Sequence, residues 1–201
     1  MSAPFTGAPP LLENKTTKLT RPTLDQLDKE LSELKEPRKH YQTYFSSPSA
    51  NVDLMNSSQG IHQFLRAYYH HKSADWSDNQ PFTLTSWDAK IMAQMPTYYI
   101  MHHGQTMPET VASEMPNEKQ IKSCEWLTEL ELQVYASEYS KNTFQGGLQW
   151  YRCATEGINQ LALSLFAGQR ILVPTLFLSG KNDWGIYQTP GAMEHMRDQV
   201  C

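Results

Sequence analysis

The apolar run ILVPTLFLSG at residues 171–180 most constrains what this 201-residue chain can fold into. Its hydrophobicity is continuous rather than alternating, which is typical of a strand buried on both faces of a parallel sheet. Such a strand needs hydrogen-bonded neighbours on at least one side. The only other strand candidate is the first few residues of the chain. We therefore expect a helical unit joined to the margin of a sheet whose other strands lie outside this chain.

Helical periodicity dominates the chain before this run. Thr23 and Gln26 have the spacing of a capping box, and the leucine-rich helix that they open ends before Pro37. Residues 38–58 are predicted to be irregular. A second amphipathic helix is predicted around residues 61–69, with its apolar side chains on one face.

The middle of the chain is divided by proline and glycine. Residues 96–127 are expected to form short helices and turns. Thr128 and Glu131 predict another capped helix. We expect Gly146–Gly147 to interrupt this helical stretch and a new helix to begin at Leu148.

Composition and charge argue against several classes of protein. The net charge is −4 with both signs dispersed, so there is no basic stripe for nucleic acid and no cationic cluster for a membrane surface. The apolar runs are too short to span a bilayer, and the N-terminus does not resemble a signal peptide. Three widely spaced cysteines form neither a disulfide framework nor a zinc pattern, which favours a reduced, cytoplasmic compartment.

Asp183 is the first candidate for chemistry, because it follows the predicted strand directly. Ligand sites of open α/β sheets lie at the carboxyl ends of strands, where an Asp commonly orients a catalytic histidine. The alternative is an ordinary turn-forming Asp.

Tyr41 and Tyr151 are the second candidates. A buried phenol can donate a hydrogen bond to an oxygen that becomes negative in a transition state, and two phenols could hold one oxygen. The alternative is amphipathic packing, which explains most of the ten tyrosines.

Several catalytic motifs do not occur in the sequence. No G-x-S-x-G or G-x-D-x-G nucleophile elbow is found, and no glycine-rich phosphate loop. The histidines have neither HExxH nor zinc-ligand spacing, so no metal site is predicted. His103–Gly104 is interpreted as a turn.

Three segments together resemble the epoxide-hydrolase branch of the α/β-hydrolases. They are RKHYQTYF at 38–45, FQGGLQWYR at 144–152 and VPTLFLSGKNDWG at 173–185, in the family's order and approximate separation. The resemblance implies an incomplete α/β-hydrolase fold, mostly a helical lid with one or two parallel-type strands of a truncated sheet. It divides the chain into the end of a core strand with a linker (1–20), the lid (21–168), and a core strand, acid loop and helix (169–201).

The resemblance also assigns roles. Enzymes of this family open an epoxide with an Asp carboxylate, hydrolyse the resulting ester to a vicinal diol, and need no metal or organic cofactor. By position, Tyr41 and Tyr151 match the lid tyrosines that hydrogen-bond the epoxide oxygen, and Asp183 matches the acid that orients the histidine. Gln42 and Trp150 are expected to contact the substrate, a small apolar epoxide.

The chain departs from this family in its central chemistry. The nucleophile Asp and the catalytic histidine would lie upstream and downstream of these 201 residues. We therefore expect no epoxide hydrolysis by this chain alone, because the reaction needs a covalent nucleophile and a general base. Two alternatives are a non-catalytic, lid-derived module that binds a lipophilic ligand or a protein partner completing the sheet, and a truncated gene product. The strand edge near residues 175–179 would favour capture of a partner.

Overall fold

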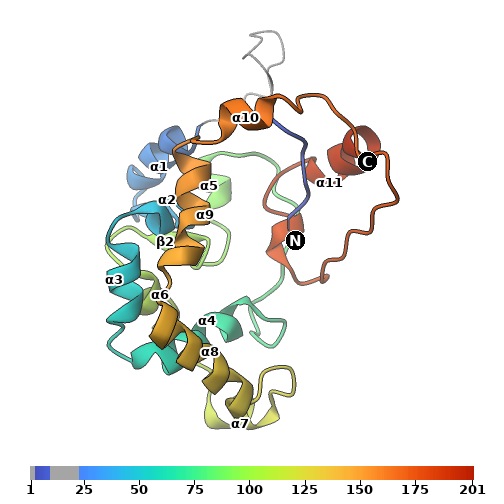
Figure 1. Ribbon diagram of the computed structural model, residues 1–201. Helices are drawn as coiled ribbons and strands as arrows, with labels where there is room; N and C mark the ends of the chain where they lie inside the picture. Colours follow the sequence, from blue (N-terminus) through green and yellow to red (C-terminus); the bar gives the residue numbers. More distant parts are fainter. Residues whose placement is uncertain (1–2, 10–22) are drawn as a thin grey trace.

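The computed structural model describes residues 3–9 and 23–201 and is mainly helical (Figure 1). In chain order its elements are α1 (Leu24–Ser32), β1 (Arg38–His40), α2 (Tyr41–Ser46), α3 (Ala50–Met55), α4 (Gly60–Lys72), α5 (Ala89–Met92), β2 (Ile100–His102), α6 (Met107–Ala112), α7 (Glu118–Ser123), α8 (Glu129–Asn142), α9 (Gln145–Thr155), α10 (Gln160–Ser164), the 3₁₀ turn η1 (Trp184–Ile186), α11 (Ala192–His195) and the π-helical turn η2 (Met196–Val200).

The predicted capping boxes are confirmed at two helices. At α1 the Thr23 side chain accepts from the backbone N–H of Gln26, whose own side chain accepts from Thr23. At α8 Thr128 and Glu131 make the same reciprocal pair. Each box satisfies N–H groups that a helix would otherwise leave without partners, which fixes where α1 and α8 begin.

The prediction that residues 38–58 are irregular is wrong. They form β1, α2 and α3, and β1 pairs antiparallel with β2, with Lys39 opposite Met101. The three-residue strands are too short to leave an alternating pattern, and their partners lie far apart in the sequence. The backbone N–H of Tyr41 donates to the carbonyl of Tyr99 and extends this contact into α2.

The expected break between two helices exists, but it lies at Thr143–Phe144 rather than at Gly146–Gly147, because α8 ends at Asn142 and α9 begins at Gln145 and runs through both glycines. A glycine inside a helix costs about 0.5–1 kcal/mol relative to alanine. Tertiary packing offsets that cost, since Leu148 is buried and Arg152 of α9 donates to the carbonyls of Ser46 and Ser47 beside α2.

The core lies within the body formed by α1 to α9. It contains fully buried side chains from most of these elements, including Leu31 of α1, Met101 of β2 and Leu132 of α8. Helix α4 lies between α6 and α8 and packs against both. This packing positions the side chains of α4 that form the sites described below.

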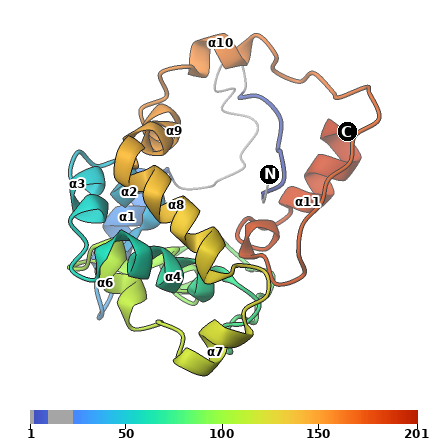
Figure 2. The same ribbon diagram turned by 60° about the horizontal axis from the view of Figure 1, so that its bottom comes forward.

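Residues 165–183 leave this body as an arm that arcs outward before it returns (Figure 2). The strand expected at 171–180 is absent here: the segment has no regular secondary structure, and Leu172 and Leu176 are 90% and 79% exposed. The physical reason is that no neighbouring strand is present among the described residues to accept its hydrogen bonds. The parallel-sheet fold class remains a prediction.

The arm rejoins the body at residues 182–187. Asn79 and Asn182 exchange side chain to backbone hydrogen bonds at 3.0 and 3.1 Å. The rings of Phe82 and Trp184 pack edge to face with centroids 5.3 Å apart. These contacts hold the loop that carries Asp183 against the body.

Residues 3–9 lie beside α11 and η2, where the backbone N–H of Phe5 approaches the Met196 sulfur at 3.4 Å. The remainder of the expected first segment (1–20) falls outside the described residues. Within residues 3–9 and 23–201, no helix is long and apolar enough to cross a membrane.

Candidate functional site

Tyr41 and Tyr151 come together although they are far apart in the sequence. Their ring centroids lie 5.8 Å apart and the rings meet edge to face. Tyr41 begins α2 and Tyr151 lies in α9, and these two helices pack closely along their length. The Phe45 ring packs against both tyrosines, with its centroid 6.1 Å from that of Tyr41 and 5.0 Å from that of Tyr151. The structure thus brings together the two phenols that the sequence singled out.

Both phenols are held in the neutral, proton-donating form. Burial raises the pKa of Tyr41, and burial with the nearby Tyr41 raises the pKa of Tyr151 to about 12. The Gln42 side-chain amide donates to the Tyr41 oxygen at 3.3 Å. Because that bond occupies the oxygen as an acceptor, the Tyr41 proton remains available for an acceptor oxygen on a ligand.

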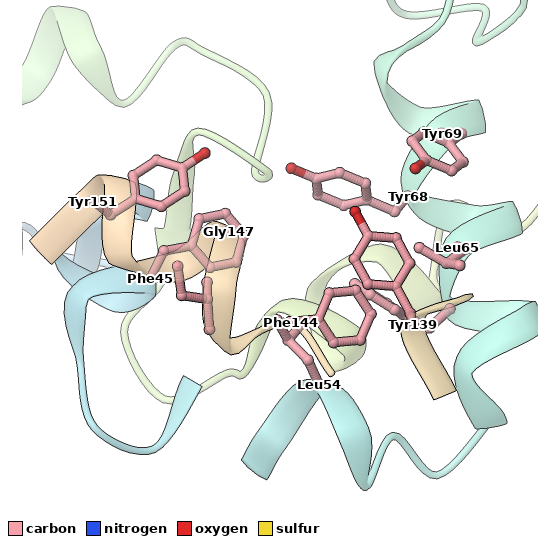
Figure 3. A pocket seen from close by; sticks show the side chains of 11 residues that line it. Phe45, Leu54, Leu65, Tyr68, Tyr69, Tyr139, Phe144, Gly147 and Tyr151 are labelled. Carbon is pink, nitrogen blue, oxygen red and sulfur yellow. The ribbon is translucent and has the colours of Figure 1, made fainter. Parts of the chain in front are cut away.

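Tyr151 also lines an apolar pocket of about 240 Å³ between α4, α8 and α9 (Figure 3). In that view the hydroxyls of Tyr151 and Tyr68 point toward one another across the pocket. The walls are aromatic and aliphatic: Phe45, Leu54, Phe64, Leu65, Tyr68, Tyr69, Tyr139, Phe144, Gly147, Leu148 and Tyr151. Apolar walls with a few phenol hydroxyls suit a small lipophilic ligand that carries an acceptor oxygen.

Trp150 lies elsewhere. It is 76% exposed on α9 and does not line this pocket. Neighbouring residues on a helix point in directions about 100° apart, so α9 cannot direct both Trp150 and Tyr151 inward here. Its expected contact with substrate remains a prediction.

Asp183 caps the turn η1 and does not line the apolar pocket that contains Tyr151, which we call the tyrosine pocket. Its carboxylate accepts from the backbone N–H of Gly185 at 2.7 Å and from the Ser179 hydroxyl at 3.3 Å. It lines a separate hollow together with Lys72 and Tyr99. Tyr99 connects this hollow to the tyrosine pair, because it lines the hollow and its ring centroid is 5.1 Å from that of Tyr41.

Lys72 and Tyr68 are functional candidates that the sequence reasoning missed. They lie on one face of α4 at i, i+4 spacing, and the Lys72 Nζ sits 5.2 Å from the Tyr68 ring centroid. Burial lowers the pKa of Lys72 to about 8, although Asp183 opposes the shift. The i, i+4 spacing of Tyr68 and Lys72 could have indicated that the two side chains are neighbours. It does not indicate burial, because a lysine at the end of an amphipathic helix is normally solvated.

The histidines do not form a metal site in the described part of the chain. No group of three or more His, Cys, Asp or Glu side chains there is arranged to hold a metal ion. His71 packs instead between the rings of Trp76 and Tyr98, with centroids 4.4 and 4.9 Å away. His103–Gly104 forms the predicted turn.

Parts of the chain are similar in sequence to epoxide hydrolases. Epoxide hydrolase 1 of Siraitia grosvenorii is 32% identical over 71 residues, which are 35% of this chain and 22% of that protein. Epoxide hydrolase A of Mycobacterium tuberculosis is 38% identical over 58 residues, which are 29% of this chain and 17% of that protein. The matched segments thus span about a fifth of each relative's length. No protein-family model and no solved structure matches the chain.

Proposed function

We propose that this chain is the lid-bearing portion of an epoxide-hydrolase-like hydrolase, in which Tyr41 and Tyr151 hold the oxygen of a small apolar epoxide. The observation that carries the proposal is the contact of these two phenol rings, 5.8 Å between centroids, of which Tyr151 lines an apolar pocket and Tyr41 lies behind it in contact with Tyr151. The partial similarity to two epoxide hydrolases supports it independently.

The chemistry of ring opening fits neutral phenols. Negative charge develops on the epoxide oxygen as its C–O bond breaks, so donors aimed at that oxygen bind the transition state more tightly than the substrate. A phenol with a raised pKa keeps its proton and introduces no competing charge. Gln42 orients the Tyr41 hydroxyl in this scheme.

The proposal includes inactivity of the chain by itself. These 201 residues have no G-x-D-x-G elbow. Asp183 does not approach the tyrosine pocket, and it is tied to the backbone of Gly185. In a complete enzyme Asp183 would orient a histidine supplied from outside these residues.

Paired ligands test the oxygen-binding role. Styrene oxide and styrene have nearly the same apolar surface, but only styrene oxide carries an acceptor oxygen. We expect the wild-type chain to bind styrene oxide several-fold more tightly, since each net hydrogen bond contributes about 0.5–1.5 kcal/mol. Affinities would be measured by titration calorimetry or ligand-observed NMR.

Matched variants complete this experiment. Tyr41→Phe and Tyr151→Phe remove one hydroxyl each and keep the ring packing. Each should therefore reduce the preference for styrene oxide without lowering the affinity for styrene. Tyr135→Phe, on the exposed side of α8, is the control that should change neither affinity. Equal affinity of the wild type for the two ligands would overturn the proposal.

A second candidate function is supported by the exposed arm. Leu172, Val173, Leu176 and Leu178 are all largely exposed. Leu176 and Leu178 border an apolar hollow of about 700 Å³ together with Met193 of α11. Exposed apolar surface of this kind marks interaction sites. A non-catalytic module that recruits a partner strand would cover it, and Leu176→Asp would then abolish the association while leaving styrene oxide binding unchanged.

A further inference from the structure

Lys72 occupies a hollow apart from the tyrosine pocket. The hollow measures about 470 Å³ and is lined by Lys72, Ala74, Tyr99 and the segment 180–183. Lys72 is the last residue of α4, which directs its side chain to the place where the arm returns to the body. The segment 180–183 brings the Asp183 carboxylate and the Lys181 ammonium to the same hollow.

Three aromatic rings lie close to the Lys72 amine. Its Nζ lies 4.3 Å from the Tyr98 ring centroid, 4.9 Å from Tyr99 and 5.2 Å from Tyr68. Among the described residues it forms no ion pair within 4.0 Å. Burial removes water from the amine and so favours its neutral form, whereas cation–π attraction to the three rings favours the ammonium.

A neutral amine is a nucleophile, and its population decides its reactivity. The pKa of Lys72 is lowered to about 8 because burial outweighs the opposing charge of Asp183. At pH 8 half of such an amine is neutral, against roughly one in 300 for an ordinary lysine. A lysine that is desolvated in an apolar pocket is the usual setting for imine chemistry with carbonyl compounds.

We propose that Lys72 is the nucleophile of a carbonyl-binding site that takes small apolar or aromatic aldehydes as a reversible imine. The nitrogen lone pair attacks the carbonyl carbon, and the oxygen takes up a proton from nitrogen to give a carbinolamine. Loss of the hydroxyl with a second proton releases water and leaves the C=N bond. Asp183 borders the same hollow and can pass the proton between nitrogen and oxygen. No oxidant or reductant is needed.

The rings that desolvate the amine also set the ligand class. Tyr98 and Tyr99 offer ring surface to an aromatic or apolar aldehyde. The volume of the hollow admits a molecule of about the size of benzaldehyde. Asp183 has a role in both proposals, and Tyr68 lies beside both sites. The carbonyl-binding site contains neither Tyr41 nor Tyr151, so the two oxygen-binding phenols can be removed without changing it.

Trapping with a hydride donor tests the site directly. The full 201-residue chain is incubated with benzaldehyde and sodium cyanoborohydride, which reduces an imine to a stable secondary amine, and peptide mass spectrometry measures labelling at each lysine. At pH 7 we expect Lys72 to be labelled at least about tenfold faster than Lys122, whose side chain is 80% exposed. The labelling rate should rise with a midpoint near pH 8.

Three controls make the result decisive. Lys72→Arg keeps the positive charge and should lose the fast-labelling site, whereas Lys122→Arg should leave it unchanged. In urea the advantage of Lys72 should vanish, because the ring cage is lost in the same polypeptide. Asp183→Asn should move the midpoint to lower pH, since the carboxylate stabilises the ammonium.

The contrary results are equally specific. Labelling of Lys72 at the rate of Lys122, or a midpoint near that of ordinary lysines, would overturn the proposal. Tyr151→Phe should reduce the preference for styrene oxide and leave Lys72 labelling unchanged. Failure of the carbonyl site and failure of the epoxide proposal are therefore separate outcomes.

Discussion

Replacement of Arg66 should loosen the helical body more than any exposed charge would. The Arg66 side chain is 3% exposed and connects α4 to the beginning of α8. Its guanidinium donates to the Leu127 carbonyl at 2.9 Å and to the Glu129 carboxylate at 2.6 Å. In Arg66→Met the aliphatic volume is largely kept, while these two hydrogen bonds and the weaker 3.8 Å contact with the Cys124 sulfur are lost.

The two bonds do not contribute equally. Leu127 is buried, so its carbonyl would be left without a partner at a cost of about 1–3 kcal/mol. The Glu129 side chain is 55% exposed, and water replaces Arg66 there at a cost of up to about 1 kcal/mol. We expect a total loss of about 1–4 kcal/mol, which lowers the melting temperature by roughly 2–16 °C in a chain of this size.

Thermal unfolding followed by far-ultraviolet circular dichroism measures this loss, and Glu129→Gln is the matched control. The control should cost less than about 1 kcal/mol. A cost in Glu129→Gln equal to that in Arg66→Met would mean that the ion pair, not the carbonyl bond, dominates. A neutral or stabilised Arg66→Met would show the opposite balance, in which the desolvation cost of the buried guanidinium exceeds the energy of its hydrogen bonds.

Two further predictions concern acid stability and the pocket wall. Burial lowers the pKa of His71 to about 3, so its contribution to stability is complete above the unfolded pKa of 6.5 and is lost progressively as pH falls toward 3. Relative to His71→Gln, the wild type should lose about 2 kcal/mol by pH 5 in urea titrations. Gly146→Ala should stabilise α9 by about 0.5–1 kcal/mol, because no atom lies within 4 Å of the added methyl group. Gly147→Ala should stabilise the helix similarly but weaken styrene oxide binding, because Gly147 lines the pocket and Gly146 does not. Equal affinity of the two variants for styrene oxide would contradict the placement of the ligand in this pocket.

Local signals in the sequence predicted local structure well. The capping boxes at Thr23 and Thr128 lie within four residues of the atoms they satisfy, so α1 and α8 could be placed from the sequence. The pairing of β1 with β2 and the continuity of α9 through its glycines depend on contacts from distant parts of the chain. No short-range pattern encodes such contacts.

The residues of the candidate site also differ in whether a local sequence pattern identifies them. Tyr41 and Tyr151 were identified through their motifs, and the packing of α2 on α9 brings them together. Lys72 was missed because its amine is buried by Tyr98, Tyr99 and the returning arm, which come from distant parts of the sequence and not from its own helix. The expected strand at 171–180 could not form, because a strand is stabilised by neighbours that the described residues do not supply.

Nuclear magnetic resonance can locate a bound epoxide directly among the tyrosines. With ring-labelled tyrosine and styrene oxide, nuclear Overhauser effects report which rings lie beside the epoxide protons, and Tyr41→Phe and Tyr151→Phe assign the signals. If the two phenols hold the epoxide oxygen, we expect effects from the epoxide protons to both Tyr41 and Tyr151. Contacts with the rings near Asp183 alone, or contacts that styrene reproduces unchanged, would contradict this expectation.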